Sequence, residues 1–407
     1  MVLHLEFQIC SFGNVKYLTY FVYFTLVNNQ SIIPMKISNL ISAFFVLFCA
    51  ANAANATIHT VNNNLNGPGQ FSSIQVAIDA AASGDTIYIA SSPTRYTNTS
   101  LGRFLVSKKL TFIGVGMRPG EKKENSALSR IGTRFDLNDA AANGSSFIGL
   151  YFDGVSSAIN VSANVSNCQV LRCWFDGSST YLGFNSGSFT GWLIANNYFG
   201  FNCGPAIDMN NNTCTNFIIQ NNVFAEISGC GIQNGSSVVA IKDFPNSANC
   251  IVSNNLFYGG QGAGVANNDQ AFFNVKNFII ENNIFHTMGP VGVSNSVFNN
   301  NITFGTVANT LPYGSNAGSN NVIDTDPQLT TFSNATFNPN QNFQPAGGPA
   351  KTGGVGGGQM GVYGGSFNWN NSAVPAIPVI KNFSITSGAT VPAGGSLNIK
   401  VTSTKQN

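Results

Sequence analysis

The hydrophobic pattern of this chain repeats with a period of roughly 24 residues, and four copies of the repeat are closely similar. Each copy has three apolar residues, a variable residue, two Asn, a variable residue and Phe: WLIANNYF, FIIQNNVF, CIVSNNLF and FIIENNIF. These copies end at Phe199, Phe224, Phe257 and Phe285. More divergent copies end at Phe152, at Phe175 and near Phe304. A β-rich unit of this length predicts a solenoid, in which each turn of the chain stacks on the next.

A second apolar segment in each unit distinguishes between the kinds of solenoid that this period allows. A leucine-rich horseshoe needs a regular Leu pattern, which the chain lacks, whereas a β-helix needs at least two short strands in each turn. The second segment lies seven or eight residues after the Phe, usually after a Gly, at Ile159, Leu182, Ile207, Ile232, Val265 and Val293. We therefore expect an all-β parallel helix whose neighbouring coils lie about 4.8 Å apart.

Stacking of the copies places like residues in columns that run along the coil. The predicted inner aromatic column contains Phe152, Phe175, Phe199, Phe224, Phe257 and Phe285. The predicted aliphatic column contains Val170, Ile194, Ile219, Val252 and Ile280. The predicted amide column contains Asn197, Asn222, Asn255 and Asn283. Asn adopts a left-handed backbone conformation more readily than most residues, and its amide can donate to and accept from the copies above and below.

Both ends of the repeat region resemble the ends of a known β-helix family. VNNNLNGPGQFSSIQVAIDAAASGDTIYI, at 61–89, resembles the family's opening, in which an amphipathic helix closes the first coil. Ser72 or Ser73 can cap this helix, and Gly84 with Asp85 can end it. Its apolar stripe consists of Ile74, Ala77, Ile78 and Ala81. DTDPQL at 324–329, followed by GGPAKTGG and QMGVYGG up to Gly365, resembles the family's closing stretch.

With these features the chain resembles the right-handed parallel β-helix proteins of the pectate-lyase-like superfamily, over about residues 57–365. The resemblance implies a right-handed parallel β-helix with an N-terminal capping helix. It does not imply a single function, because this fold hosts lyases, hydrolases, epimerases, adhesins and inert shafts.

The segments outside the repeat have different characters. Residues 35–56, MKISNLISAFFVLFCAANAANA, have the basic start, short apolar run and Ala-x-Ala sites of a signal peptide, so we interpret residues 1–34 as a mis-assigned upstream start. The β-helix domain is expected at 57–367. Residues 368–407 are expected to form a linker and a short extension of two strands, near 379–386 and 397–402. The apolar run is too short to span a bilayer, so we expect a secreted protein, extracellular, at the cell surface or periplasmic, with no transmembrane anchor in the mature chain.

The chain carries very little charge. Charged residues make up 8% of it, with 18 Lys and Arg against 16 Asp and Glu, where soluble domains average about 25%. Such a chain cannot build the basic face that binding to nucleic acid requires. With 43% hydrophobic residues it can bury a large core, which argues against disorder. Asn and Gly, at 56 and 43 residues, supply the polar and turn-forming positions instead.

The cysteines permit disulfides without specifying any. Of the 8 Cys, Cys10 and Cys49 precede the predicted cleavage. The remaining six are Cys168, Cys173, Cys203, Cys214, Cys230 and Cys250. An even number in an exported chain allows pairing, but their places in the stacking columns favour free buried thiols. None forms a CxxC pair, so a zinc site has little support.

Two carboxylates are candidates for a cation site. Asp153 and Asp176 directly follow the Phe of neighbouring copies, so their carboxylates should lie about one strand spacing apart. Like charges this close favour a bound cation, here Ca²⁺, or a raised pKa for one carboxyl. The alternative is that both side chains point into solvent at a turn.

The two longest repeats contain rare charges that are candidates for catalysis and binding. Lys242 with Asp243, and Asp269 with Lys276, lie in what we predict to be inserted loops, and insertions in solenoids often line one binding face. His286 occupies the same column as Asp153 and Asp176, where it could act as a base. Solvated loop charges and a structural His are the alternatives.

Four aromatic residues flank the inner Phe column and are expected to point outward: Tyr151, Trp174, Tyr198 and Tyr258. Outward rings can hold the apolar faces of sugar rings. The alternative is that they cover the corners of the coil.

We therefore carry two functional hypotheses for what we expect to be a monomer. The first is a protein that binds extracellular or cell-surface polysaccharide without catalysis. The second is a polysaccharide lyase-like or glycoside hydrolase-like enzyme that acts on an acidic polysaccharide with Lys242, Asp243, Asp269 and His286. The resemblance implies that lyases of this fold need a cation and a basic residue, and its hydrolases paired carboxylates. The chain contains neither set in full: it has no triple-Asp group, no RxPxxR stretch and no Gly-His-Gly.

Overall fold

The structure is a computed structural model, and it contains two units, Met1–Asn55 and Ala56–Asn407. It describes residues 2–12, 15–25, 56–64, 67–117, 128–177, 180–201, 204–226, 239–259, 269–306, 310–330, 342–369, 378–385 and 399–405. The first unit contains an antiparallel hairpin of β1 (Val2–Phe12) and β2 (Val15–Thr25). The predicted signal peptide lies outside the described residues, except for Ala56.

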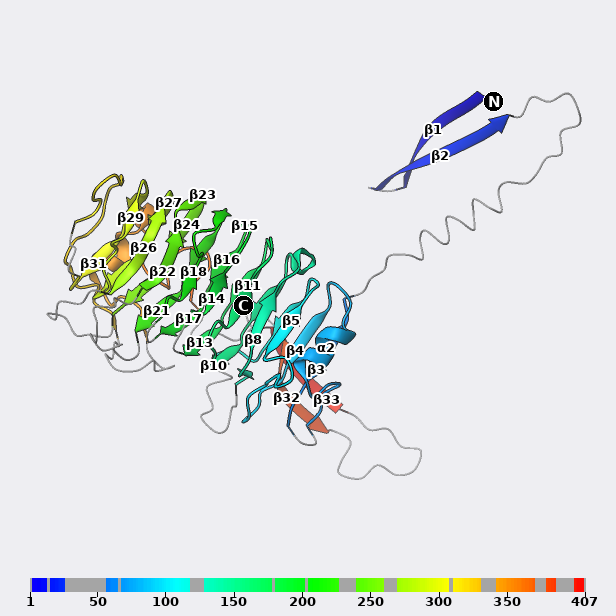
Figure 1. Ribbon diagram of the computed structural model, residues 1–407, viewed down its shortest axis with the longest axis horizontal. Coiled ribbons are helices and arrows are strands. Elements are labelled where there is room, and N and C mark those ends of the chain that lie inside the picture. The colour runs from blue at the N-terminus through cyan, green and yellow to red at the C-terminus, as the bar shows by residue number, and fades with distance from the viewer. Residues whose placement is uncertain are drawn as a thin grey trace, which may run out of the picture. The chain divides into compact units, whose positions relative to one another are not determined.

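The second unit is a right-handed parallel β-helix, as predicted, and Figure 1 shows its strands side by side along the coil. The first sheet contains β3 (Ile58–Val61), β4 (Thr86–Ile89), β6 (Thr111–Ile113), β9 (Ser146–Ile148), β12 (Gln169–Leu171), β16 (Leu193–Ala195), β20 (Ile218–Gln220), β24 (Cys250–Ser253), β27 (Phe278–Glu281) and β30 (Val297–Asn299). The second sheet contains β7 (Arg130–Ile131), β10 (Tyr151–Asp153), β13 (Trp174–Gly177), β17 (Tyr198–Phe201), β21 (Val223–Glu226), β25 (Leu256–Tyr258), β28 (Ile284–His286) and β31 (Ile302–Phe304).

Each coil continues from the second sheet into a third. The third sheet contains β5 (Arg103–Val106), β8 (Arg134–Leu137), β11 (Ile159–Val161), β14 (Leu182–Phe184), β18 (Ile207–Asp208), β22 (Val239–Phe244), β26 (Gln270–Lys276) and β29 (Val293–Ser294). A short corner sheet leads three of the coils back to the first sheet and contains β15 (Ser188–Thr190), β19 (Thr213–Thr215) and β23 (Asn246–Ala248). Parallel pairing between successive coils makes like residues stack, which is why the sequence repeat is visible at all.

The predicted aromatic and aliphatic columns are confirmed. Neighbouring rings from Phe152 to Phe285 stack with centroids 4.7–5.0 Å apart, and all six are fully buried. The aliphatic residues lie in register from Val170 to Ile280 and are also fully buried. The core is therefore a set of continuous stacks inside the coil.

Each Asn-Asn pair lies at the corner between the first and second sheets. The first Asn has a left-handed backbone, with φ of 56° at Asn196 and 54° at Asn221. The second Asn points into the corner, where Asn197 donates to Asn222 Oδ1 at 3.0 Å and Asn222 donates to Asn255 Oδ1 at 3.0 Å. The same bonds continue through Asn283 and Asn301 to Asn321, beyond the predicted amide column. Buried amides thus bond to one another in place of water.

The position of the second strand is wrong in the two longest coils. Ile159, Leu182 and Ile207 lie in register in the third sheet, but the next places in that column belong to Ile241 and Phe272. The predicted residues Ile232 and Val265 lie outside the described residues. The extra residues of these coils therefore precede the third-sheet strand, so Lys242, Asp243 and Lys276 belong to strands and not to inserted loops.

The N-terminal capping helix is present as α2 (Ile74–Ala80), which buries Ile74, Ala77 and Ile78. Ser73 occupies its N-cap position without a capping side-chain bond, and the helix ends before the predicted Gly84. The shorter helical segments are η1 (Ala140–Ala142), α3 (Gly348–Thr352) and η2 (Val355–Gly357). The predicted pair of C-terminal strands is present as the antiparallel β32 (Pro378–Ile385) and β33 (Ile399–Lys405).

The segment 342–369 covers the outer face of the second sheet. Its apolar residues Phe343, Met360, Val362 and Trp369 belong to a second hydrophobic cluster, outside the coil. This cluster includes outward residues of the second sheet: Tyr198, Val223, Ala225, Leu256, Tyr258, Ile284 and Ile302. We call residues 353–369 the C-terminal strap, because they run back along the coil from Asn300 to Asn196.

Candidate functional site

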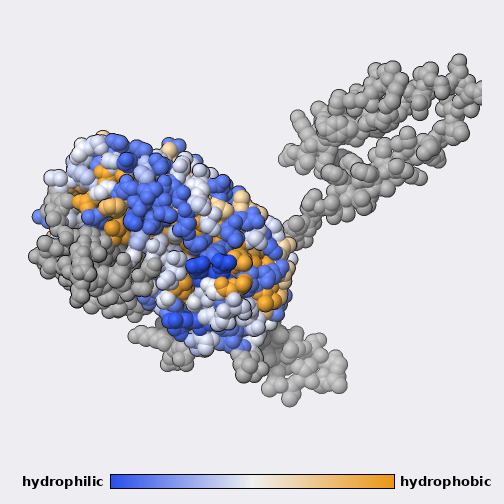
Figure 2. Space-filling model, viewed as in Figure 1, coloured by the Kyte–Doolittle hydropathy of each residue, from blue (hydrophilic) through white to orange (hydrophobic). Residues whose placement is uncertain are grey.

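The candidate residues Lys242 and Asp243 lie on the outer face of the third sheet. Asp208, Lys242 and Phe273 follow one another in register across β18, β22 and β26. Lys242 Nζ lies 3.2 Å from Asp243 Oδ2 and 3.6 Å from Asp208 Oδ2. We call Asp208, Lys242, Asp243, Phe273 and Asn274 the Lys242 cluster. Figure 2 shows a mostly hydrophilic surface over these strands.

Backbone geometry brings Asp243 and Asn274 into this cluster. Both residues have left-handed backbones within their strands, with φ of 59° and 54°. Asn274 Nδ2 donates to Asp243 Oδ1 at 2.9 Å and to Asn211 Oδ1 at 3.0 Å. Three successive coils are therefore linked by side-chain amides and carboxylates on the surface.

The electrostatics of the Lys242 cluster leave no spare positive charge. Burial raises the pKa of Asp208, and Asp243 adds to that effect. Burial lowers the pKa of Lys242, but the two carboxylates outweigh it and the pKa is raised. The group contains two aspartates for its one lysine. Lys242 is thus neither a ready base nor a free cation for an acidic ligand.

An aromatic ring stands exposed beside this charge. Phe273 is 47% exposed, although its neighbours Phe272 and Val275 in β26 are buried. Its outward direction follows from strand alternation, since Phe272 occupies the inner column. Sequence reasoning missed Phe273 and Asp208. If the insertion had been placed correctly, Phe272 would have been assigned to the inner column, and strand alternation would then have directed Phe273 outward.

The other candidate charges do not join the Lys242 cluster. Asp269 is buried and precedes β26, four residues before Phe273, which corresponds to about 13 Å along an extended chain. Lys276 ends β26, opposite Ser294. His286 belongs to the second sheet, where its ring lies 5.4 Å from Tyr258 and 5.2 Å from Phe304, and burial lowers its pKa. The predicted catalytic residues therefore do not form one site.

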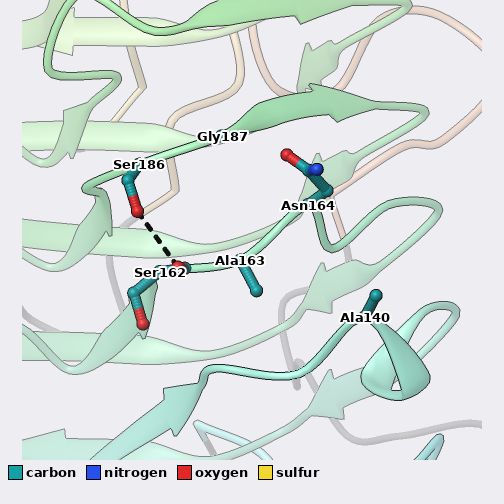
Figure 3. A pocket seen from close by; sticks show the side chains of 6 residues that line it. All are labelled: Ala140, Ser162, Ala163, Asn164, Ser186 and Gly187. Atoms are coloured by element: carbon teal, nitrogen blue, oxygen red, sulfur yellow. Dashed lines mark hydrogen bonds between the residues drawn. The ribbon is translucent and has the colours of Figure 1, made fainter.

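A polar rim and a shallow hollow continue this face toward the corner sheet. Asn210 and Asn211 are exposed beside Asp208, and Asn185 donates to Asn160 Oδ1. The hollow in Figure 3 follows, lined by Ala140, Ser162, Ala163, Asn164, Ser186 and Gly187. Ser186 Oγ donates across it to the Ser162 carbonyl at 3.0 Å. These side chains offer hydroxyl and amide groups without charge.

The predicted pairing of Asp153 and Asp176 is confirmed, but cations of the protein already hold Asp153. The two residues lie in register on β10 and β13. Arg95 Nε and Nη2 donate to the two oxygens of Asp153, each at 2.9 Å, and Arg130 Nε donates to Oδ2 at 2.9 Å. Among the described residues, no group of three or more His, Cys, Asp or Glu side chains could hold a metal ion. The Ca²⁺ site stays a prediction, and Arg95 and Arg130 supply the charge that Ca²⁺ was expected to supply.

The two carboxyls differ in their surroundings. Burial raises the pKa of Asp153, but Arg95 and Arg130 outweigh it and the pKa is lowered. Burial and the charge of Asp153 raise the pKa of Asp176, although its carboxylate accepts a bond from Tyr151 Oη at 3.1 Å. Sequence reasoning missed Arg95 and Arg130, because Arg95 lies 58 residues before Asp153 and no local pattern links them.

The predicted aromatic binding face is mostly covered. Tyr198 is 1% exposed and Tyr258 is 6% exposed, because both belong to the cluster beneath the segment 342–369. Trp174 and Tyr151 are half-buried, and their rings lie 4.5 Å apart at 33°. Tyr198 and Tyr258 are therefore covered, whereas sugar binding by the partly exposed Tyr151 and Trp174 stays a prediction.

The chain matches no protein-family model, no curated protein and no solved structure. Within the described ranges, no helix has the length and apolar character needed to cross a membrane.

Proposed function

We propose that this protein is a secreted, monomeric member of the pectate-lyase-like superfamily that binds a polysaccharide without cleaving it. The observation that carries the proposal is the exposed Phe273 ring in register with Lys242 on a polar sheet face. Sugar-binding surfaces combine an aromatic ring, which packs against C–H groups, with amides and carboxylates that bond to hydroxyls. Asn274 directly follows Phe273 and bonds to Asn211, and Asp208 lies on the same face, one strand beyond Lys242.

The charge of the surface favours a neutral or amino-sugar polymer. Asp208 and Asp243 already neutralise Lys242, so a uronate polymer would gain no free cation there. An amino sugar would meet two carboxylates, whereas a neutral sugar needs only hydroxyl partners. The acidic polymer that our second hypothesis requires is the least favoured ligand of this face.

The proposal is tested by affinity electrophoresis on three immobilised polymers: a neutral β-glucan, chitosan and polygalacturonate. We expect the wild-type chain to be retarded by the glucan or by chitosan. Phe273→Ala should weaken that binding about tenfold, because loss of one stacked ring costs about 1.4 kcal/mol. Ile279→Ala is the matched control, since Ile279 is 40% exposed but lies on the first sheet. Equal retardation of the wild type and Phe273→Ala would contradict the proposal.

A hydrolase remains the second candidate, because Asp153 and Asp176 lie side by side with pKa values shifted in opposite directions. The three polymers are therefore also assayed for new reducing ends and for unsaturated products that absorb in the ultraviolet. Release of reducing ends by the wild type, lost in Asp176→Asn, would replace the binding proposal by this one. Unsaturated products would instead indicate a lyase.

A further inference from the structure

Two buried cysteines face each other across successive coils. Cys214 lies in β19 of the corner sheet, and Cys250 is the first residue of β24 in the first sheet. Both are fully buried, and their Sγ atoms are 3.9 Å apart. A disulfide has sulfur atoms about 2.05 Å apart, so the two Sγ atoms would have to move closer together to form one.

The repeat explains why these two thiols meet. Cys250 follows Asn249, whose left-handed backbone (φ 54°) turns the chain at the corner, and Cys214 comes two residues before the equivalent Asn216 (φ 56°) of the previous coil. The Cys250 thiol donates to the Ala248 carbonyl at 3.4 Å. The pairing thus arises from the corner geometry that every coil shares.

An earlier pair of coils carries only one thiol at the corresponding places. Cys168 occupies the column of Cys250, since each directly precedes first-sheet residues that stack in register. The counterpart of Cys214 is Ala142, which lies two residues before Gly144 (φ 75°). The Sγ atom of Cys168 lies 3.8 Å from the carbonyl oxygen of Ala142. The chain therefore contains a matched position in which the second sulfur is missing.

We propose that Cys214 and Cys250 form a disulfide when the chain folds in an oxidising medium. One thiolate attacks a small-molecule disulfide such as oxidised glutathione, releasing one glutathione thiol and leaving a mixed disulfide. The second cysteine, as its thiolate, displaces the remaining glutathione. Overall, the two cysteines lose two protons and two electrons, and the oxidant becomes two thiols. Because both sulfurs are buried in the finished coil, the exchange takes place as these coils close.

The disulfide would link two coils across 36 residues of chain. A cross-link of this span restricts the unfolded chain, so the melting temperature should rise by several degrees when it forms. This inference does not depend on sugar binding. Cys214 and Cys250 are free and buried in the structure, as the sequence predicts, and the proposal concerns their oxidation.

The test is to refold the full chain in a buffer of oxidised and reduced glutathione, block remaining thiols and map the disulfides by mass spectrometry without reduction. We expect a linked peptide pair containing Cys214 and Cys250, and a melting temperature that falls by several degrees after reduction. The Cys214→Ser variant should lose both the link and the effect of reductant, while Cys173→Ser should keep both.

The Ala142→Cys variant provides a positive control for the geometry. It should form a second disulfide, to Cys168, because it restores the missing sulfur at the equivalent corner. Complete blocking of Cys214 and Cys250 after oxidative refolding, or a link from either to a different cysteine, would overturn the proposal. A folded Cys214→Ser variant with the same response to reductant would do the same.

Discussion

At the residue scale, the two Asn of each repeat have different roles. Asn196, Asn221, Asn254 and Asn282 have left-handed backbones, and their side chains reach outward to the C-terminal strap. The Asn that follows each of them bonds inward along the corner. Replacement of the first Asn removes contacts with the strap, whereas replacement of the second leaves buried partners unpaired in several coils.

We predict that Asn222→Ala lowers the free energy of unfolding by about 2–4 kcal/mol. Asn222 Nδ2 donates to the Ile194 carbonyl at 2.8 Å and to Asn255 Oδ1, and its Oδ1 accepts from Asn197. Urea unfolding measures the loss. Asn246→Ala, at an exposed Asn with one bond to the Asn211 carbonyl, should cost less than about 0.5 kcal/mol. Equal effects would contradict the role of the buried column.

A second residue-scale prediction concerns pH. Asp85 accepts bonds from the backbone N–H groups of Thr57 and Ala82, each at 2.8 Å, and lies 2.9 Å from His59 Nε2. The Thr57 bond and then His59 lower the pKa of Asp85 below 3.8. The stabilisation is therefore complete above the unfolded pKa and is lost as the pH falls through the folded pKa.

Asp85→Asn should accordingly be less stable than the wild type at pH 7, by about 1–3 kcal/mol, and the difference should shrink below pH 4. Unfolding free energies measured at both pH values check this. Asp79→Asn is the control, because Asp79 is exposed and its carboxylate accepts a bond from the Gln75 side chain at 2.8 Å. A difference that persisted unchanged at low pH would refute the assignment.

At the element scale, the C-terminal strap decides which face of the coil remains open. Asn221 Nδ2 donates to the carbonyls of Val362 and Gly364, at 2.9 and 2.8 Å. The strap approaches the coil closely because it is rich in glycine. A Cβ at Gly361 would lie 2.5 Å from Ile284 Cδ1, and one at Gly364 would lie 2.4 Å from Asn254 Nδ2. The strap covers the second sheet and leaves the third sheet as the exposed polar face.

We predict that Asn221→Gly loosens the strap without unfolding the coil. Glycine keeps the left-handed backbone but removes both bonds, so amide hydrogen exchange in residues 359–369 should become about tenfold faster. Asn216→Gly is the matched control, because Asn216 has φ of 56° at an exposed corner away from the strap. The same acceleration in both variants would contradict the contact that we assign to Asn221.

At the scale of the whole molecule, the β-helix is a stack in which stabilising contacts run mainly between neighbouring coils. The six stacked Phe rings and the amide bonds connect each coil to the next. Among the described residues, Lys or Arg side chains meet Asp side chains at few places: Asp153 with Arg95 and Arg130, the Lys242 cluster, and Asp136 with Arg134 at 2.8 Å and Arg103 at 3.7 Å. Local damage should therefore spread outward along the stack.

Phe224→Ala should lower the free energy of unfolding by about 3–5 kcal/mol, because it removes a buried ring that stacks on Phe199 at 4.9 Å and on Phe257 at 4.8 Å. Hydrogen exchange should show the largest loss of protection in β17, β21 and β25, and a smaller one in β4 and β6. Uniform loss of protection across the coil would indicate that the molecule opens as a single unit.

Much of the fold could be predicted from the sequence because the contacts that build it repeat. Stacked coils require the same residue type every turn, so the Phe, aliphatic and Asn columns are visible as a period. The capping helix and the two C-terminal strands also have local patterns. The third-sheet strand of the two longest coils could not be placed. An insertion lengthens the stretch between the Phe and this strand, but the strand that follows the insertion keeps the same kind of residues.

The sequence by itself determined the parallel coil, its inner columns and the adjacency of Asp153 and Asp176, because each depends on spacing within one turn. Only the tertiary structure decided which outward residues meet solvent. Tyr198 and Tyr258 point outward as alternation requires, yet residues more than 80 positions later cover them. Arg95 reaches Asp153 across 58 residues, and Asp208 and Phe273 become neighbours of Lys242 only through register. Contacts between distant segments leave no period in the chain, and the candidate site consists largely of such contacts.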